Sequence, residues 1–241
     1  MRENKNHKTA YNVFGYDGHL HQLEHAKKTV NNSKSSLGIE TKEGIILLSH
    51  NTSNNSKLLR KSSITQIYSL DSNCAMTMSG HTTDGRMLAE KLREYIEEEK
   101  SNYGELTDVK VLAHKISNNL QETIQSTELR PYGVSLLIGG LNKKDEPQLY
   151  KVDIDGTTSA WKSICIGKQS SKIMDMIERN YIEDITLTEG KQLLVNSFVN
   201  QINENITPEM ISIIQITKDN GLEKIDNEEI NNLIQNVGDL E

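Results

Sequence analysis

The order in which hydrophobic spacing changes along this chain constrains its possible folds more than any other feature. One leading segment has helical spacing, and segments with the alternation or the continuous apolar runs of strands follow it. Two helical segments come next, strands return, two more helical segments follow, and a strand and a helix end the chain. The expected helices span about 20–30, 87–96, 109–120, 173–177, 194–202 and 226 onwards. The expected strands span 36–40, 44–49, 64–70, 74–79, 134–139, 148–153, 163–167 and 210–217.

Short connections between strands indicate antiparallel sheets, as at the turn formed by residues 42–44, which marks a hairpin. Paired amphipathic helices between groups of strands must bury their apolar stripes, so we expect them to cover the outer faces of two sheets. This order predicts an α+β fold, a four-layer αββα sandwich with an extra N-terminal helix. No linker interrupts the pattern, so we expect a mobile polar tail over 1–15 and a single domain over 16–241.

Composition disfavours several classes of partner. The net charge is -7, which argues against nucleic acid because phosphate binding needs a basic surface. The longest apolar run, 44–48, is far shorter than the roughly 20 residues of a membrane span, and the N-terminus lacks a secretory signal. We therefore expect a soluble, intracellular protein with no membrane partner. Cys74 and Cys165 are typical of buried apolar residues in a reducing compartment, with a disulfide or a metal pair as the alternative.

A histidine cluster near the N-terminus raises the question of a metal site. His21 and His25 are four residues apart, so both lie on one face of the expected helix, with Glu24 nearby. A short metalloprotease signature would have Glu directly after the first His, where this chain has Gln22. No third ligand is evident, so we interpret the segment as a packed or exposed interface helix and expect no metal and no cofactor. The alternative is a stand-alone metal-binding or adaptor module built on His19–His25.

No nucleophile has an evident set of partners. The sequence contains no Gly-x-Ser-x-Gly turn, no Gly-x-Gly-x-x-Gly and no phosphate-binding loop. Ser79 and His81 flank Gly80 at the end of an expected strand, where a turn is the better interpretation. Asp153 and Asp155 lie beside a turn, and such a pair more often caps a hairpin than transfers protons. The residues alone therefore indicate a binding protein and not an enzyme.

Several segments, in order along the chain, resemble the motifs of one family. Residues 14–26 read FGYDGHLHQLEHA, residues 79–84 read SGHTTD, and residues 130–135 read RPYGVS. The hairpin that follows in the family is matched at 149–150, 153–156, 161–162 and 166–167. Over roughly residues 7–238 the chain therefore resembles the alpha-type subunits of the 20S proteasome.

The resemblance implies the N-terminal-nucleophile hydrolase fold, which is the αββα sandwich expected above. It also implies that the leading helix contacts neighbouring subunits, with Leu20, Leu23 and Val30 on the interface. Residues 161–181 resemble the second or fourth eukaryotic alpha type, whereas parts of 36–80 resemble the fifth.

The expected function is that of a non-catalytic structural subunit of a heteroheptameric alpha ring. The other alpha subunits, the beta ring, and a regulatory particle or other activators would be its partners. The subunit would contribute to substrate gating and activator docking in ubiquitin-dependent protein degradation, in the cytoplasm and nucleus.

The same resemblance argues against catalysis by this chain. Catalytic members of the family use an N-terminal Thr whose free amine assists its hydroxyl. Alignment on the turn at 43–44 places Lys34 at that position. His50 takes the place of the supporting Asp, and Thr65 or Gln66 that of the supporting Lys. The alternative is a divergent N-terminal-nucleophile hydrolase that matures before a Ser or Thr.

Departures from the family pattern fall on residues that hold the tails in the open-gate arrangement. His7 and Lys8 replace the family's Tyr-Asp pair, and Tyr16 replaces its Pro. His25 and Thr123 replace two further Tyr residues. The resemblance therefore implies an altered role in gating.

The resemblance also implies an activator pocket that includes Gln66, Gly80 and Glu24. In the family, a Lys at the first of these positions receives the C-terminal carboxylate of activators. Gln66 would remove that charge-assisted contact. We therefore expect Gln66→Lys to strengthen activator docking at this ring position, and unchanged affinity in a reconstituted particle would contradict this expectation.

Overall fold

The structure is a computed structural model that describes residues 13–51, 66–104, 107–126, 128–202 and 206–237. Within these residues, two five-stranded sheets stack on each other, and every pair of neighbouring strands is antiparallel. The first sheet has the order β10-β9-β2-β1-β8, with bounds β10 Gly221–Lys224, β9 Ile211–Thr217, β2 Gly44–His50, β1 Ser36–Glu40 and β8 Ser163–Ile166. The second has the order β3-β4-β5-β6-β7, with bounds β3 Ile67–Asp71, β4 Cys74–Gly80, β5 Val134–Leu141, β6 Pro147–Val152 and β7 Thr158–Ala160.

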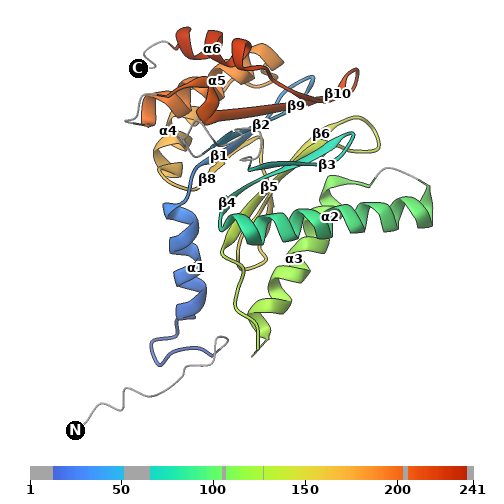
Figure 1. The fold of residues 1–241 in the computed structure, drawn as a ribbon, viewed down its shortest axis with the longest axis vertical. Helices are drawn as coiled ribbons and strands as arrows, with labels where there is room; N and C mark the ends of the chain where they lie inside the picture. Colours follow the sequence, from blue (N-terminus) through green and yellow to red (C-terminus); the bar gives the residue numbers. More distant parts are fainter. Residues whose placement is uncertain (1–12, 52–65, 105–106, 127, 203–205, 238–241) are drawn as a thin grey trace, which may run out of the picture.

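Helices cover both outer faces of this pair of sheets (Figure 1). One face carries α4 (Ser170–Asn180), α5 (Leu187–Gln201) and α6 (Asn227–Gln235), with the short 3-10 turn η2 (Pro208–Met210) before β9. The other face carries α2 (Thr82–Tyr103) and α3 (Val109–Gln125). Helix α1 (His21–Asn32) projects away from the sandwich. The predicted four-layer αββα sandwich with an extra N-terminal helix is confirmed.

Three apolar clusters separate the four layers. One fills the space between the first sheet and helices α4 to α6, one lies between the sheets, and one lies between the second sheet and helices α2 and α3. Strand β2 contributes to two of them, because Ile46 and Leu48 face the helices while Ile45 and Leu47 face the other sheet. All seven of its residues are buried. Burial on both faces explains why this strand reads as a continuous apolar run and not as an alternation.

Two strands, β7 and β10, were absent from the sequence prediction. Each lies at the edge of its sheet, and none of their residues is buried. An edge strand that packs little apolar surface leaves no hydrophobic pattern in the sequence, so its pairing follows from the neighbouring strand. The expected strand at 64–70 begins at Ile67 in the described structure, and its first two residues lie outside the described ranges.

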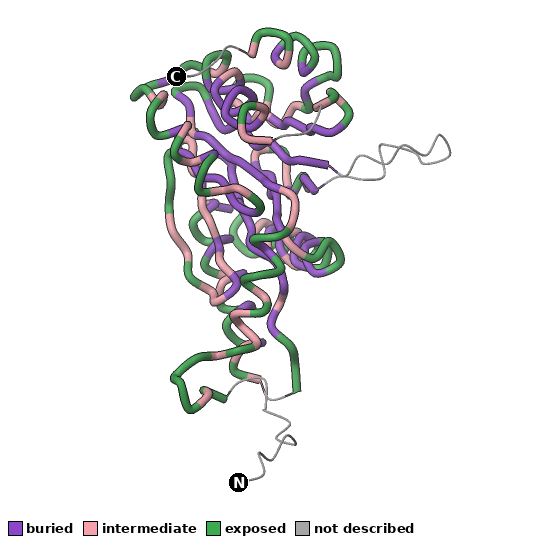
Figure 2. The backbone as a smooth tube through the Cα atoms, turned by 90° about the vertical axis from the view of Figure 1, so that its left-hand side faces the viewer, coloured by how far each residue is buried: buried purple, intermediate pink, exposed green. Residues whose placement is uncertain are grey.

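Helix α1 packs much less closely than the rest of the fold. Val30 is its one buried residue, while Leu20, which precedes the helix, and Leu23 are half-buried. The helix contacts β4 and β5, and Lys27 Nζ pairs with Asp155 Oδ2 at 3.0 Å. Figure 2 shows mostly exposed and half-buried positions along this projecting part, in contrast to the buried strands.

Candidate functional site

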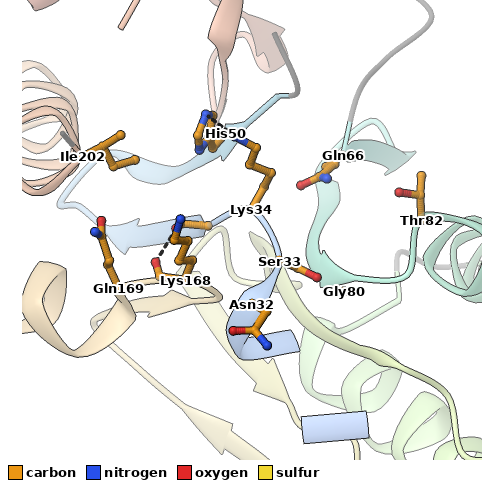
Figure 3. Close-up of a pocket in the computed structure, with 11 residues that line it drawn as sticks. Asn32, Ser33, Lys34, His50, Gln66, Gly80, Thr82, Lys168, Gln169 and Ile202 are labelled. Carbon is orange, nitrogen blue, oxygen red and sulfur yellow. Dashed lines mark hydrogen bonds between the residues drawn. The ribbon is translucent and has the colours of Figure 1, made fainter. Parts of the chain in front are cut away.

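A polar cavity of about 540 Å³ lies where the C-terminal end of α1 meets the ends of both sheets (Figure 3). Its lining comes from the last residue of α1 and the turn after it, the ends of β2 and β4, the residue before β3, the first residue of α2, the segment before α4 and the residue after α5. The lining residues are Asn32, Ser33, Lys34, Ser35, His50, Gln66, Gly80, Thr82, Lys168, Gln169 and Ile202.

Three of these residues are the ones that the family alignment placed at catalytic positions. Lys34 Nζ lies 3.3 Å from His50 Nε2, and Gln66 lines the same cavity. His50 is 3% exposed, and its ring meets that of Phe198 edge-on, with centroids 5.2 Å apart. The alignment therefore identified residues that the fold does bring together. Thr65, the alternative to Gln66, lies outside the described residues.

The chemical groups in this cavity differ from those of an N-terminal nucleophile. The alignment on 43–44 places Lys34 at the nucleophile position, and the two hydroxyls that follow it donate to backbone carbonyls. Ser35 Oγ donates to Lys168 O at 2.6 Å, and Ser36 Oγ donates to Met78 O at 2.7 Å. The cavity presents ammonium, imidazole and amide groups, which bind polar ligands.

The predicted activator pocket is brought together in part. Gln66 and Gly80 line the cavity, whereas Glu24 lies on α1, where its carboxylate is 2.5 Å from His19 Nδ1. Gly80 has φ +131, and a Cβ there would lie 2.1 Å from Gly133 O. Only glycine fits this close approach of β4 to the start of β5.

An ion pair next to the cavity, between the buried Asp84 and the exposed Arg130, was not predicted. The Arg130 guanidinium donates to both carboxylate oxygens of Asp84 at 2.7 Å, and the Gly133 N–H donates to Asp84 Oδ2 at 3.0 Å. Burial raises the pKa of Asp84, but the hydrogen bonds from Arg130 and Gly133 outweigh it and hold this pKa below its usual value. Asp84 lies in the SGHTTD motif and Arg130 in the RPYGVS motif. Both partners therefore belong to segments that carry the family resemblance, although the sequence does not show that they pair.

Comparison with known proteins identifies the fold's family. The model of the family described as "Proteasome subunit" matches residues 30–216. The chain belongs to the proteasome subunit family. It is 35% identical to the proteasome subunit alpha of Methanocaldococcus jannaschii, over 95% of this chain and 87% of that protein. It is 33% identical to proteasome subunit alpha 2 of Haloferax volcanii, over 94% of this chain and 91% of that protein.

These relatives make the chain a proteasome alpha subunit, the type that forms a structural component of the 20S proteasome in protein degradation and is generally non-catalytic. A third relative, the proteasome subunit alpha of Haloquadratum walsbyi, is 31% identical over 86% of this chain and 82% of that protein. All three relatives are archaeal, so the resemblance to a eukaryotic alpha type is not confirmed by them.

The predicted gate residues of this alpha subunit lie on separate elements. Tyr16 is exposed before α1, and His25 is exposed on α1. Thr123 is buried in α3, where its Oγ1 donates to Leu120 O at 2.7 Å. His7 and Lys8 lie outside the described residues. Gating by these residues stays a prediction.

Other groups singled out in the sequence have structural partners. His21 Nε2 lies 3.4 Å from Asp17 Oδ2, and across the described ranges no group of three His, Cys, Asp or Glu side chains is placed to hold a metal ion. Cys74 and Cys165 are free thiols in different apolar clusters, and burial raises the pKa of both. In the described part of the chain, no helix has the length and apolar character needed to cross a bilayer.

The segments at 79–81 and 153–156, which were predicted to be structural, form hydrogen bonds within the fold. Ser79 Oγ donates to Lys34 O at 2.8 Å, so its hydroxyl fixes the cavity wall. In the β6–β7 turn, the Thr157 N–H donates to Asp155 Oδ1 at 3.0 Å. Asp153 accepts from Ser135 Oγ at 2.7 Å. Asp155 therefore stabilises the β6–β7 hairpin, whereas Asp153 links it to β5.

Proposed function

We propose that this chain is a non-catalytic structural subunit of the alpha ring of the 20S proteasome, and that it contributes to substrate gating and activator docking. The observation that supports the proposal is the Lys34–His50 contact, because the alignment on 43–44 places Lys34 at the position of the family's nucleophile. An N-terminal nucleophile needs a hydroxyl and its own free amine, and Lys34 supplies neither. What the chain offers instead are surfaces for neighbouring subunits.

Residues 1–15 would form the gate tail, and residues 16–241 a single alpha-type domain. The thin packing of α1 supports a role in contacts between subunits, because a helix with one buried residue leaves its apolar positions at Leu20 and Leu23 incompletely covered. Neighbouring alpha subunits would cover them. The inner face of the subunit would contact the beta ring. Its outer face would contact the regulatory particle or another activator.

We further propose a heteroheptameric ring, with this chain at the second or fourth alpha position. Gln66 supports a mixed ring: in a ring of identical copies, every activator pocket would lack the cation at position 66, whereas other alpha subunits could retain it. Such a particle would act in ubiquitin-dependent degradation in the cytoplasm and nucleus.

Native mass spectrometry of the particle that contains this chain tests the proposal. The expected result is a full-length chain, in a ring with other alpha subunits stacked on a beta ring. Deletion of residues 2–15 from this chain is expected to raise hydrolysis of a short fluorogenic peptide several-fold, because the gate tail is removed. A mature chain that begins at Ser35 or Ser36 and cleaves peptides by itself would instead establish a divergent N-terminal-nucleophile hydrolase.

A further inference from the structure

A row of serines crosses the first sheet at the end that carries the cavity. Ser36 on β1 lies directly opposite Ser49 on β2, and Ser49 lies directly opposite Ser212 on β9. Residues directly opposite each other in an antiparallel pair point to the same face of the sheet. The three hydroxyl groups therefore form one row across three neighbouring strands.

This serine row points into the layer between the two sheets. Leu47 and Ile214 are paired with each other and belong to the apolar cluster between the sheets. Ser49 and Ser212 each lie two residues away on the same strands, and because side chains alternate between faces, they share that face. Ser36 and Ser49 are 0% exposed, and Ser212 is 7% exposed. The layer between the sheets therefore changes from apolar to polar side chains while it is still buried.

The two ends of the row have hydrogen-bond partners within the protein. Ser36 Oγ donates to Met78 O at 2.7 Å and accepts from Thr77 Oγ1 at 3.0 Å, so this serine joins the first sheet to the second. At the other end of the row, Asn51 Nδ2 donates to Ser212 Oγ at 2.6 Å. These contacts hold both ends of the row in fixed positions.

Two polar atoms in the middle of this arrangement lack a partner. Within the described residues, Ser49 Oγ and Asn51 Oδ1 are buried side-chain atoms without a hydrogen bond. Asn51 is 6% exposed, and its amide contacts Ser212, the cross-strand neighbour of Ser49, so the two atoms lie close together. Buried polar groups in folded proteins nearly always have a partner, which is either a protein group or an ordered water. The pair of unpaired atoms therefore indicates a ligand between them.

The chemistry of these side chains defines the ligand. Ser49 has no exposed surface, so the ligand must be small enough to be enclosed by the fold. Ser49, Asn51 and Ser212 are uncharged, and an ion without a counter-charge is costly to bury, so the ligand is neutral. An amide oxygen only accepts, whereas a serine hydroxyl can donate and accept. Water meets all of these requirements, and a buried water in a protein typically makes about three hydrogen bonds.

We infer that an ordered water molecule binds on the inter-sheet face of β2 and β9, between Ser49, Asn51 and Ser212. The water donates to Asn51 Oδ1, accepts from the Ser212 hydroxyl and forms its third hydrogen bond with Ser49 Oγ. Ser49 and Asn51 flank His50, which lines the cavity. The water thereby fixes, from the inter-sheet side, the end of β2 that carries this cavity residue. Its binding does not depend on ring assembly, so this site and the proposed function can fail separately.

Thermal unfolding of the full chain, at one fixed protein concentration, tests the site through the sign of a single substitution. Ser49→Ala is expected to lower the midpoint of thermal unfolding, Tm, by about 2–4 °C, because the bound water loses one of its three hydrogen bonds. Without a bound water, the same substitution would remove an unsatisfied buried hydroxyl, and Tm would rise or stay unchanged.

Two matched serine variants calibrate this shift. Ser69→Ala, at an exposed position of the edge strand β3, is expected to leave Tm within about 1 °C of the parent. Ser36→Ala removes a buried hydroxyl of the same row whose partners are protein groups. It is expected to lower Tm by at least as much as Ser49→Ala, because it leaves those groups without their partner.

A crystal structure of the full chain, alone or in the particle that it forms, shows the water directly. We expect density for a water oxygen within about 3.2 Å of both Ser49 Oγ and Asn51 Oδ1. This density is expected to be lost in Ser49→Val, whose branched side chain takes up the space and offers no hydrogen bond. Absence of the water in the parent, a direct hydrogen bond between the two side chains, or a Tm of Ser49→Ala at or above that of the parent would overturn the inference.

Discussion

The sandwich and helix α1 differ in what holds them in place. In the sandwich, β2 is buried at all seven positions and takes part in two apolar clusters. In α1, Val30 is the one buried residue of twelve. Most helical stability in proteins comes from packing an apolar face and not from intrinsic propensity. The comparison indicates that the sandwich is stabilised by its own packing, whereas α1 has little packing within the chain, as expected if a neighbouring subunit covers it as proposed.

The largest expected effect comes from opening the core beneath α5. Phe198 is completely buried in the cluster between the first sheet and the helices, and its ring contacts His50. Phe198→Ala is expected to lower the free energy of unfolding by about 4 kcal/mol, because apolar burial is removed and a cavity is left behind. Urea unfolding measures it. Ile182→Ala, at a side chain that is 70% exposed, is the control and is expected to cost less than about 0.5 kcal/mol.

The second effect concerns the ion pair that ties the start of α2 to the start of β5. Arg130→Ala removes the guanidinium from the Asp84 carboxylate, whose side chain is 4% exposed, and leaves the Gly133 N–H as its backbone donor. We expect the free energy of unfolding to fall by about 2 kcal/mol at neutral pH, because the carboxylate is buried while the guanidinium is 58% exposed to water. The fall is expected to be smaller in Arg130→Lys, which keeps the charge but not the two-pronged geometry.

The pH dependence of this effect has a definite sign. Because the folded pKa of Asp84 is below its usual 3.8, the stability from this pair is present above the unfolded pKa and is lost as pH falls through the folded pKa. The gap between parent and Arg130→Ala is therefore expected to narrow below about pH 4. A gap that stays constant from pH 7 to pH 3 would show that the carboxylate charge is not what the arginine stabilises.

The same comparison explains which features the sequence predicts. Strands such as β2 and helices such as α3 repeat apolar residues at the spacing of their own geometry, so each segment carries its own signal. The Asp84–Arg130 pair joins residues 46 positions apart, and no local pattern encodes such a pairing. The cavity is similar, because Lys34 lies in the turn after α1, His50 ends β2 and Gln66 precedes β3, and only the resemblance to a family indicated that the three belong together.

Removing apolar surface from α1 tests whether this helix matters more for assembly than for the stability of the chain. Leu20→Ser combined with Leu23→Ser is expected to lower the free energy of unfolding by less than about 1 kcal/mol, since both side chains are only half-buried. Ring formation is expected to fall sharply, because the same positions are proposed to be covered by a neighbour. Native mass spectrometry of the chain expressed with its partner subunits measures this. Assembly at the parent level would contradict the assignment of α1 to the interface.

The smallest effect is expected at the ion pair between α1 and the β6–β7 turn. Lys27 and Asp155 are 3.0 Å apart, and Lys27 is 46% exposed, so water and salt screen their attraction. Burial raises the pKa of Asp155, but hydrogen bonds from Thr157 and Lys27 lower it more, so the net pKa lies below its usual value. Asp155→Asn is expected to cost at most about 1 kcal/mol.

Lys27→Met tests the same ion pair from the other partner, and Lys28→Met, at an exposed neighbour, is its matched control. Urea unfolding at low salt and at 1 M NaCl is the measurement, because screening should reduce the difference between Lys27→Met and the control. A destabilisation above about 2 kcal/mol that salt does not change would mean that α1 is fixed to the sandwich within one chain. The contrast between a self-sufficient sandwich and a dependent helix would then fail.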